Sequence, residues 1–179
     1  MGRYVAFLRG MNLGGRRVTN DVLRAHFETM GFTGVTPFLA SGNIVFDSPR
    51  NDPEQLSRRI EKGLGDALNY HVPTFLRSGK EVRSIAARRV FTAEQVNAGG
   101  KVQVALLHHR PDEAARAKVL RLSSPEDRLA IHCRELYWLP CGNLLDSELD
   151  LATIEKAIGP MTFRTHRTLE RLTAKYLVE

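Results

Sequence analysis

The sequence predicts an α+β fold built from two similar halves. In each half, the hydrophobic pattern indicates a strand, a helix, two strands joined by a short turn, and a second helix. The paired strands meet at Ser41-Gly42 in the first half and at Cys133-Arg134 in the second, and short turns between apolar runs are typical of hairpins. With one more strand, which is predicted in the first half only, this order is the β-α-β-β-α-β pattern. We therefore interpret the chain as a tandem duplication of two ferredoxin-like halves, the second ending in a C-terminal helix.

The first half, residues 1–78, contains the complete pattern. The continuous apolar run from Tyr4 to Leu8 predicts a strand that is buried on both faces. Thr19 or Asn20 can cap the first helix, and Gly31 can end it. The remaining elements follow in order: strands at 35–40 and 44–47, a helix opened by Asp52-Pro53, and a last strand at 72–77.

Residues 79–100 are predicted to form a helical connector between the halves. This segment contains or adjoins two pairs with the spacing of a capping box, which favours short helices over disorder. The pairs are Ser78 with Glu81 and Thr92 with Gln95.

The second half, residues 101–179, repeats the order of elements but differs at its end. We expect strands at 102–108, 129–132 and 136–139, and helices opened by Pro111-Asp112 and by Ser147. Gly159-Pro160 ends the second of these helices, and we predict no strand after it. A helix from about 165 to 177 is expected in place of the eighth strand.

The composition excludes several classes of protein. The chain has 179 residues, of which 42% are hydrophobic and 26% charged, as in ordinary globular proteins. Its net charge of +6 is compatible with an anionic partner but identifies none. No apolar run has membrane or signal-segment length, and Cys133, Cys141 and the histidines lack metal-site spacing. We therefore expect a cytoplasmic protein without membrane contact, disulfide, metal or cofactor, while its oligomeric state stays open.

The best indication of a site is the loop that follows the first strand, Arg9 to Arg17. Its glycines allow close approach of a ligand to backbone N–H groups, and its arginines can neutralise an anion. Gly10 and Gly15 have the spacing of a phosphate loop, but Arg16 and Arg17 replace the lysine and the hydroxyl residue. Because no hydroxyl is present there to bind magnesium, a nucleoside triphosphatase of that type is not expected. The alternative is a loop that needs glycine only for its backbone shape.

We interpret this loop as part of a site for a phosphorylated small molecule or a nucleotide. Ser41 and Asn43 at the hairpin are either further ligands or local turn residues. Arg164 is placed just before or within the first turn of the last helix, where a cation opposes the helix dipole. We expect it to converge with Arg9, Asn12, Arg16 and Asn43 on one side of the molecule. The predicted ligand-binding residues are Arg9, Gly10, Asn12, Gly14, Gly15, Arg16, Ser41, Asn43, Arg164 and Thr168.

Two other classes of function stay open. The spacing of Arg164, Arg167, Arg171 and Lys175 puts them on one helix face, which is either a solvated surface or the basic face of a nucleic-acid-binding module. An RNA-recognition sheet would instead need stacking aromatic residues, and we interpret the candidates Phe7 and Phe46 as core. The third class is an enzyme of unrecognised reaction type, because the sequence defines no nucleophile, base or metal set.

Three segments of the chain carry a family resemblance. LRGMNLGGRR, FLASGNIVFDS and MTFRTHRTLERL resemble motifs of the bacterial DUF1697 family, a domain of unknown function, and they occur in the same order. The first is similar to LRGINVGGKN, with Arg16 at the lysine, and the second to QSGNVVF. Cys141 departs from a further family segment, which argues against a role as nucleophile. The resemblance implies tandem ferredoxin-like halves and no particular activity. Its later matches are Pro140, Gly142, Ser147, Leu149, Thr162, Arg164, Thr168 and Leu172.

Overall fold

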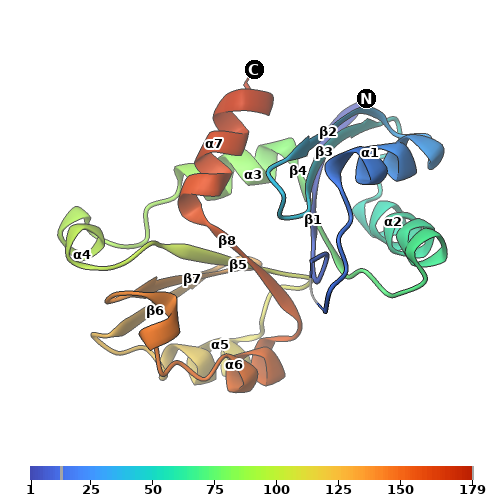
Figure 1. The fold of residues 1–179 in the computed structure, drawn as a ribbon. Coiled ribbons are helices and arrows are strands. Elements are labelled where there is room, and N and C mark those ends of the chain that lie inside the picture. The colour runs from blue at the N-terminus through green and yellow to red at the C-terminus, as the bar shows by residue number, and fades with distance from the viewer. Residues whose placement is uncertain (13, 179) are drawn as a thin grey trace. The chain divides into compact units, whose positions relative to one another are not determined.

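The computed structural model describes residues 1–12 and 14–178, which form a mixed α+β structure with two four-stranded antiparallel sheets (Figure 1). The chain divides into two compact units. The first comprises residues 1–83 with the chain from Leu172 onward, and the second comprises residues 84–171.

The first unit contains the predicted strand–helix–hairpin–helix–strand order. Its sheet has the strand order β2-β3-β1-β4, with β1 paired antiparallel to both β3 and β4. Helix α1 begins where the Thr19 side chain accepts a hydrogen bond from the Val22 N–H, and α2 begins after Asp52 with proline in its first turn. The elements are β1 (Gly2–Leu8), α1 (Asn20–Thr29), β2 (Thr33–Phe38), β3 (Asn43–Ser48), α2 (Pro53–Leu68) and β4 (Thr74–Ser78).

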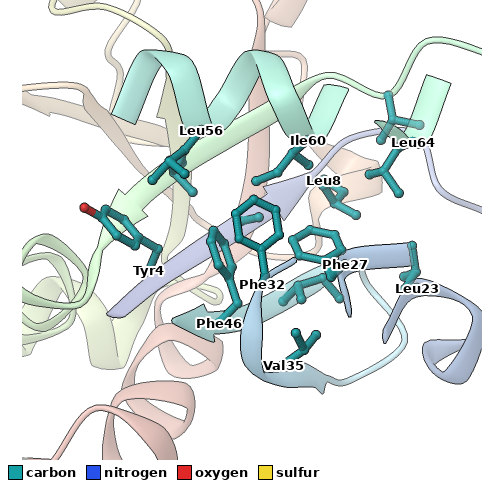
Figure 2. Close-up of a cluster of buried hydrophobic side chains, with 14 of the residues drawn as sticks. Tyr4, Leu8, Leu23, Phe27, Phe32, Val35, Phe46, Leu56, Ile60 and Leu64 are labelled. Atoms are coloured by element: carbon teal, nitrogen blue, oxygen red, sulfur yellow. The ribbon is translucent and has the colours of Figure 1, made fainter. Parts of the chain in front are cut away.

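The core of the first unit lies between its sheet and its two helices (Figure 2). Successive side chains of β1 point to opposite faces, so Tyr4, Ala6 and Leu8 face the helices. An aromatic group fills the centre, where the rings of Phe32 and Phe46 have centroids 4.6 Å apart. Phe7 and Phe46 are fully buried, so their interpretation as core residues is confirmed.

The second unit has a sheet of equivalent strand order, β6-β7-β5-β8. Figure 1 shows α5 and α6 side by side, and their side chains pack with those of the sheet around Trp138. The predicted short helices of the connector are also present. The elements after β4 are α3 (Gly79–Ala87), α4 (Ala93–Ala98), β5 (Gln103–Leu107), α5 (Glu113–Leu120), β6 (Asp127–His132), β7 (Glu135–Pro140), α6 (Leu151–Ile158), β8 (Met161–Thr165) and α7 (His166–Tyr176), with a 3₁₀ turn at Leu144–Asp146.

Strand β8 corrects the sequence prediction, which placed no strand after Gly159-Pro160. Met161 to Thr165 pairs antiparallel with β5 along its whole length, and α7 begins only at His166. The strand alternates in the usual way: Met161 and Phe163 join the core, while Arg164 lies on the opposite face. This alternation of apolar and polar residues is itself a strand pattern. The sequence prediction did not assign it because the run is only 5 residues long and the predicted helix begins at its last residue.

None of the helices in the part of the chain that the structure describes is long and apolar enough to cross a membrane.

The contribution of the aromatic core to the free energy of unfolding can be measured with a single substitution. Replacing Phe46 with alanine removes a fully buried ring that packs against Tyr4, Phe27 and Phe32. We expect the free energy of unfolding to fall by about 3–5 kcal/mol, as measured by urea denaturation followed by circular dichroism. Val22→Ala on the exposed face of α1 is the control and should change stability by less than about 0.5 kcal/mol. Similar losses for the two variants would contradict the packing described here.

Candidate functional site

The loop between β1 and α1 is anchored by two backbone hydrogen bonds where it leaves the strand. The Leu8 N–H donates to the Gly42 carbonyl (2.8 Å) and the Arg9 N–H to the Pro73 carbonyl (3.0 Å). Met11 is then buried in the first core. These contacts fix the direction in which the chain leaves the sheet.

The glycine loop and the β2–β3 hairpin turn lie beside each other. The side-chain amide of Asn12 donates to the Ala40 carbonyl at 2.8 Å. Gly42 packs so closely that a Cβ there would lie 3.0 Å from the Leu8 Cβ, and its φ of +70° is in the left-handed region. A hairpin turn with glycine at this point therefore lets the two segments meet.

A hollow of about 650 Å³ opens between this loop and the amino end of α1. Arg16 and Arg17 are exposed there, and the loop reaches them through Gly14 and Gly15, whose φ values are +63° and +79°. None of the described residues that line the hollow carries a carboxylate. The lining residues are Asn12, Gly15, Arg16, Arg17, Val18, Thr19, Asn20 and Ala40.

Arg16 is held by an aromatic residue that the sequence analysis did not identify. Its guanidinium carbon lies 4.1 Å from the centroid of the Tyr70 ring, a distance at which the cation is attracted to the ring face. Tyr70 follows α2, after Asn69 adopts a left-handed conformation with φ of +59°, and packs against the first core. No local sequence signal connects positions 16 and 70, because the contact depends on the fold.

The predicted loop residues fall into two groups. Asn12, Gly15 and Arg16 line the hollow. Arg9, Gly10 and Gly14 belong to the same loop but are not among the lining residues, although Gly10 and Gly14 supply positive φ values of 75° and 63°. Leu13, which belongs to the predicted loop from Arg9 to Arg17, lies outside the described residues.

Asn43 and Ser41 have a local role in the hairpin turn. Asn43 is fully buried, and its side-chain amide donates to the Phe38 carbonyl at 3.0 Å and to the Ser41 hydroxyl at 2.8 Å. The interpretation of these residues as local turn residues is therefore confirmed. Their predicted contact with a ligand stays a prediction.

Arg164 differs from its predicted environment. It lies in β8 just before α7, which is one of the two predicted positions, but only 8% of its surface is exposed, so its description as an exposed charge is wrong. Its guanidinium donates to the Thr162 hydroxyl (3.0 Å) and the Phe163 carbonyl (2.8 Å). Burial lowers the pKa of Arg164 to about 10.

Thr168 takes part in the start of α7. The Thr165 hydroxyl accepts a hydrogen bond from the Thr168 N–H at 3.1 Å, and the two hydroxyl groups lie 2.8 Å apart. This is the geometry of a helix cap, and it accounts for the polar character of both residues. Arg164 and Thr168 both lie in the second unit, and their predicted convergence with the glycine loop stays a prediction.

Two antiparallel sheets of equivalent strand order, each with helices in the same sequence positions, define a duplicated α+β protein. The chain belongs to the family described as protein of unknown function (DUF1697), whose sequence profile matches residues 1–137. The fold is similar to that of the conserved bacterial protein SP0830 from Streptococcus pneumoniae, with 20% sequence identity, a TM-score of 0.69 and 97% of each chain covered. A search of curated proteins found no match.

The role of Asn43 can be tested by its effect on stability. Asn43→Ala removes the donor that satisfies the Phe38 carbonyl within a buried turn. We expect a loss of about 1–3 kcal/mol in the free energy of unfolding, measured by chemical denaturation. Ser41→Ala, which removes only the exposed partner, should lose less. Equal, negligible losses would show that the Asn43 amide does not hold the turn.

The buried position of Arg164 predicts a different result from an exposed charge. Arg164→Ala removes two hydrogen bonds and the packing of a long side chain, so the free energy of unfolding should fall by more than about 1 kcal/mol. Arg167→Ala, on the exposed side of α7, should change it by less than about 0.5 kcal/mol. Thermal and urea unfolding of the two variants compare them directly, and equal stabilities would contradict the assigned burial.

Proposed function

We propose that this protein binds a phosphorylated small molecule or a nucleotide in the hollow formed by the glycine loop and the amino end of α1. The observation that carries the proposal is that one hollow is lined by two arginines and by the amino end of a helix, and that none of its described lining residues has a carboxylate. Helix amino ends and guanidinium groups both favour phosphate. A volume of about 650 Å³ lies within the range of small-molecule sites.

Arg16 supports the proposal through its preorganisation. An exposed arginine loses side-chain entropy when it binds a ligand, and this cost opposes binding. Stacking on Tyr70 already restricts the Arg16 side chain. A cation–π contact depends on the charge of the guanidinium and not on its N–H donors, so these donors would be available for a forked contact with phosphate oxygens.

The glycine residues and Asn12 have supporting roles in this proposal. Gly14 and Gly15 adopt left-handed conformations that bring the chain around to Arg16. Asn12 holds the loop to the hairpin turn through Ala40. Backbone N–H groups of the loop would orient the anion while the arginines neutralise it.

We also propose that each half is a ferredoxin-like unit, residues 1–78 and 101–179, joined by a helical connector at 79–100. The support is the element order together with the strand orders β2-β3-β1-β4 and β6-β7-β5-β8. In both sheets the first and third strands of the half occupy the centre. Such a repeat places the glycine loop after a central strand, a frequent position for ligand sites.

Nucleic-acid binding through α7 is left with a shorter basic face than the sequence indicated. Arg167, Arg171 and Lys175 are exposed, but Arg164 precedes the helix and is buried. The experiment on the phosphate site therefore also distinguishes binding at that site from nucleic-acid binding to a basic surface.

The proposed site can be tested by ligand-dependent thermal stability. Inorganic phosphate, pyrophosphate, AMP, ATP and glucose 6-phosphate would be titrated to 10 mM against the purified protein at constant ionic strength. A ligand present at about 100 times its dissociation constant should stabilise the protein by about 2.7 kcal/mol. For a chain of this size the midpoint temperature should then rise by about 5–10 °C.

Arg16→Gln is the decisive variant, and Arg24→Gln is its matched control. Both remove one positive charge from the first unit, but only Arg16 lines the hollow, and Arg24 is exposed on α1. We expect Arg16→Gln to weaken the best ligand by about tenfold or more and Arg24→Gln to have little effect. Absence of any shift with the wild-type protein would overturn the proposal. Equal weakening by both variants, with a steep dependence on salt, would indicate a diffuse polyanion surface instead.

A further inference from the structure

A second hollow, of about 560 Å³, lies within the second unit and shares no residue with the glycine loop. Its walls come from the segment after α3, from α4, from the segment before β5, and from the junction of β8 with α7. Apolar and charged side chains both line it. The apolar ones are Val90, Phe91, Val96 and Val102, together with the ring of Tyr137.

Hydrogen bonds hold these walls in place. The backbone N–H of His166 donates to the Val102 carbonyl at 2.9 Å, which joins the start of α7 to the segment before β5. The Gly100 N–H donates to the Pro140 carbonyl at 2.6 Å, and a side chain at Gly100 would collide with the Gly142 carbonyl. The walls at the start of α7 and before β5 are therefore held by backbone hydrogen bonds, and a ligand would order little additional chain there.

A buried histidine and an ion pair form one side of the hollow. Arg89 donates to the Glu170 carboxylate at 2.7 Å, and the ring of His166 lies against both groups. The His166 Nδ1 is 3.5 Å from the Glu170 Oε1, and its Nε2 is 3.4 Å from the Arg89 Nη1. A guanidinium can only donate, so the contact with Arg89 favours the tautomer in which Nε2 accepts and Nδ1 carries the proton. Burial lowers the pKa of His166, in agreement with a neutral ring.

The charges around the hollow do not balance. Its described lining residues include four cationic side chains and one carboxylate, and that carboxylate is already paired with Arg89. In the part of the chain that the structure describes, Arg88, Lys101 and Arg167 have no carboxylate partner. Three cations beside an apolar wall therefore lack a counter-charge.

We infer that this hollow binds a small organic anion that joins a flat apolar ring to a carboxylate or phosphate group. The valines and Phe91 would cover the ring, and Arg88, Lys101 and Arg167 would surround the anionic group. The Arg89–Glu170 pair and His166 would form one wall of the site and keep their contacts with one another when the ligand binds. This site is independent of the glycine loop and of the function proposed for that loop.

The proposed site can be tested with fluorescent probes of the stated chemistry. 2-Naphthoate and 2-naphthyl phosphate would be titrated against the full chain, with 2-naphthamide as the uncharged analogue and inorganic phosphate as the anion without a ring. We expect saturable binding of at least one naphthyl anion below millimolar concentration. The amide and inorganic phosphate should bind at least about tenfold more weakly, because each lacks one half of the recognised chemistry. Comparison of the two anions shows whether the carboxylate or the phosphate is preferred.

Val96→Glu and Asn97→Glu form a matched pair of variants on α4. Both positions are exposed and receive the same charge, but only Val96 lines the hollow. Val96→Glu should weaken naphthyl-anion binding about tenfold or more by placing a carboxylate beside the anion, whereas Asn97→Glu should change it less than about twofold. Lys101→Gln should also weaken binding, and Arg16→Gln should leave it unchanged. Absence of binding to the wild-type protein, or equal effects of the two glutamate variants, would overturn the inference.

Discussion

The backbone hydrogen bonds at the end of β1 determine the geometry of the glycine loop. β1 is a central strand that pairs with β3 and β4, so its last residues are held from both sides. The N–H groups of Leu8 and Arg9 continue this pairing beyond the regular ladder, to Gly42 and Pro73. The loop therefore leaves the sheet at a defined point and in a defined direction. These two bonds hold the start of the loop in the position from which Asn12 contacts the hairpin turn.

The apolar core supplies the rigidity that these hydrogen bonds require. Met11 is buried just before Asn12, in the same cluster as the side chains of β1, α1 and α2. Backbone hydrogen bonds each contribute about 1 kcal/mol net, which is too little to fix an exposed loop alone. A buried side chain contributes about 1.5–3 kcal/mol, so Met11 anchors the loop more strongly than any single hydrogen bond. The arginines that follow can then stay exposed without loss of the loop position.

The sequence predicts the features that depend on local chemistry. Both hairpins, the Asp52-Pro53 helix start and the Thr92–Gln95 capping box occur as predicted, because each depends on residues within a few positions. β8 was not predicted, although apolar and polar residues alternate along it, because the strand is short and leads directly into a helix. The burial of Arg164 could not be predicted either, because it depends on tertiary packing and not on the pattern of neighbouring residues in the sequence. The pairing of Arg16 with Tyr70 has the same origin, because 54 positions separate the two residues along the chain.

The identity of the residue at position 16 affects the chemistry that the loop can perform. The resembling family motif has lysine here, and this chain has arginine. An ammonium group acts as a point charge, whereas a guanidinium has a flat face and several N–H donors at its edge. The guanidinium carbon of Arg16 lies over the Tyr70 ring, so this contact restricts the position of the side chain. In the proposed site, the N–H donors of this guanidinium would suit two oxygens of one phosphate better than a single oxygen. Tyr70 and Arg16 therefore form one structural unit, in which the ring determines where the guanidinium lies.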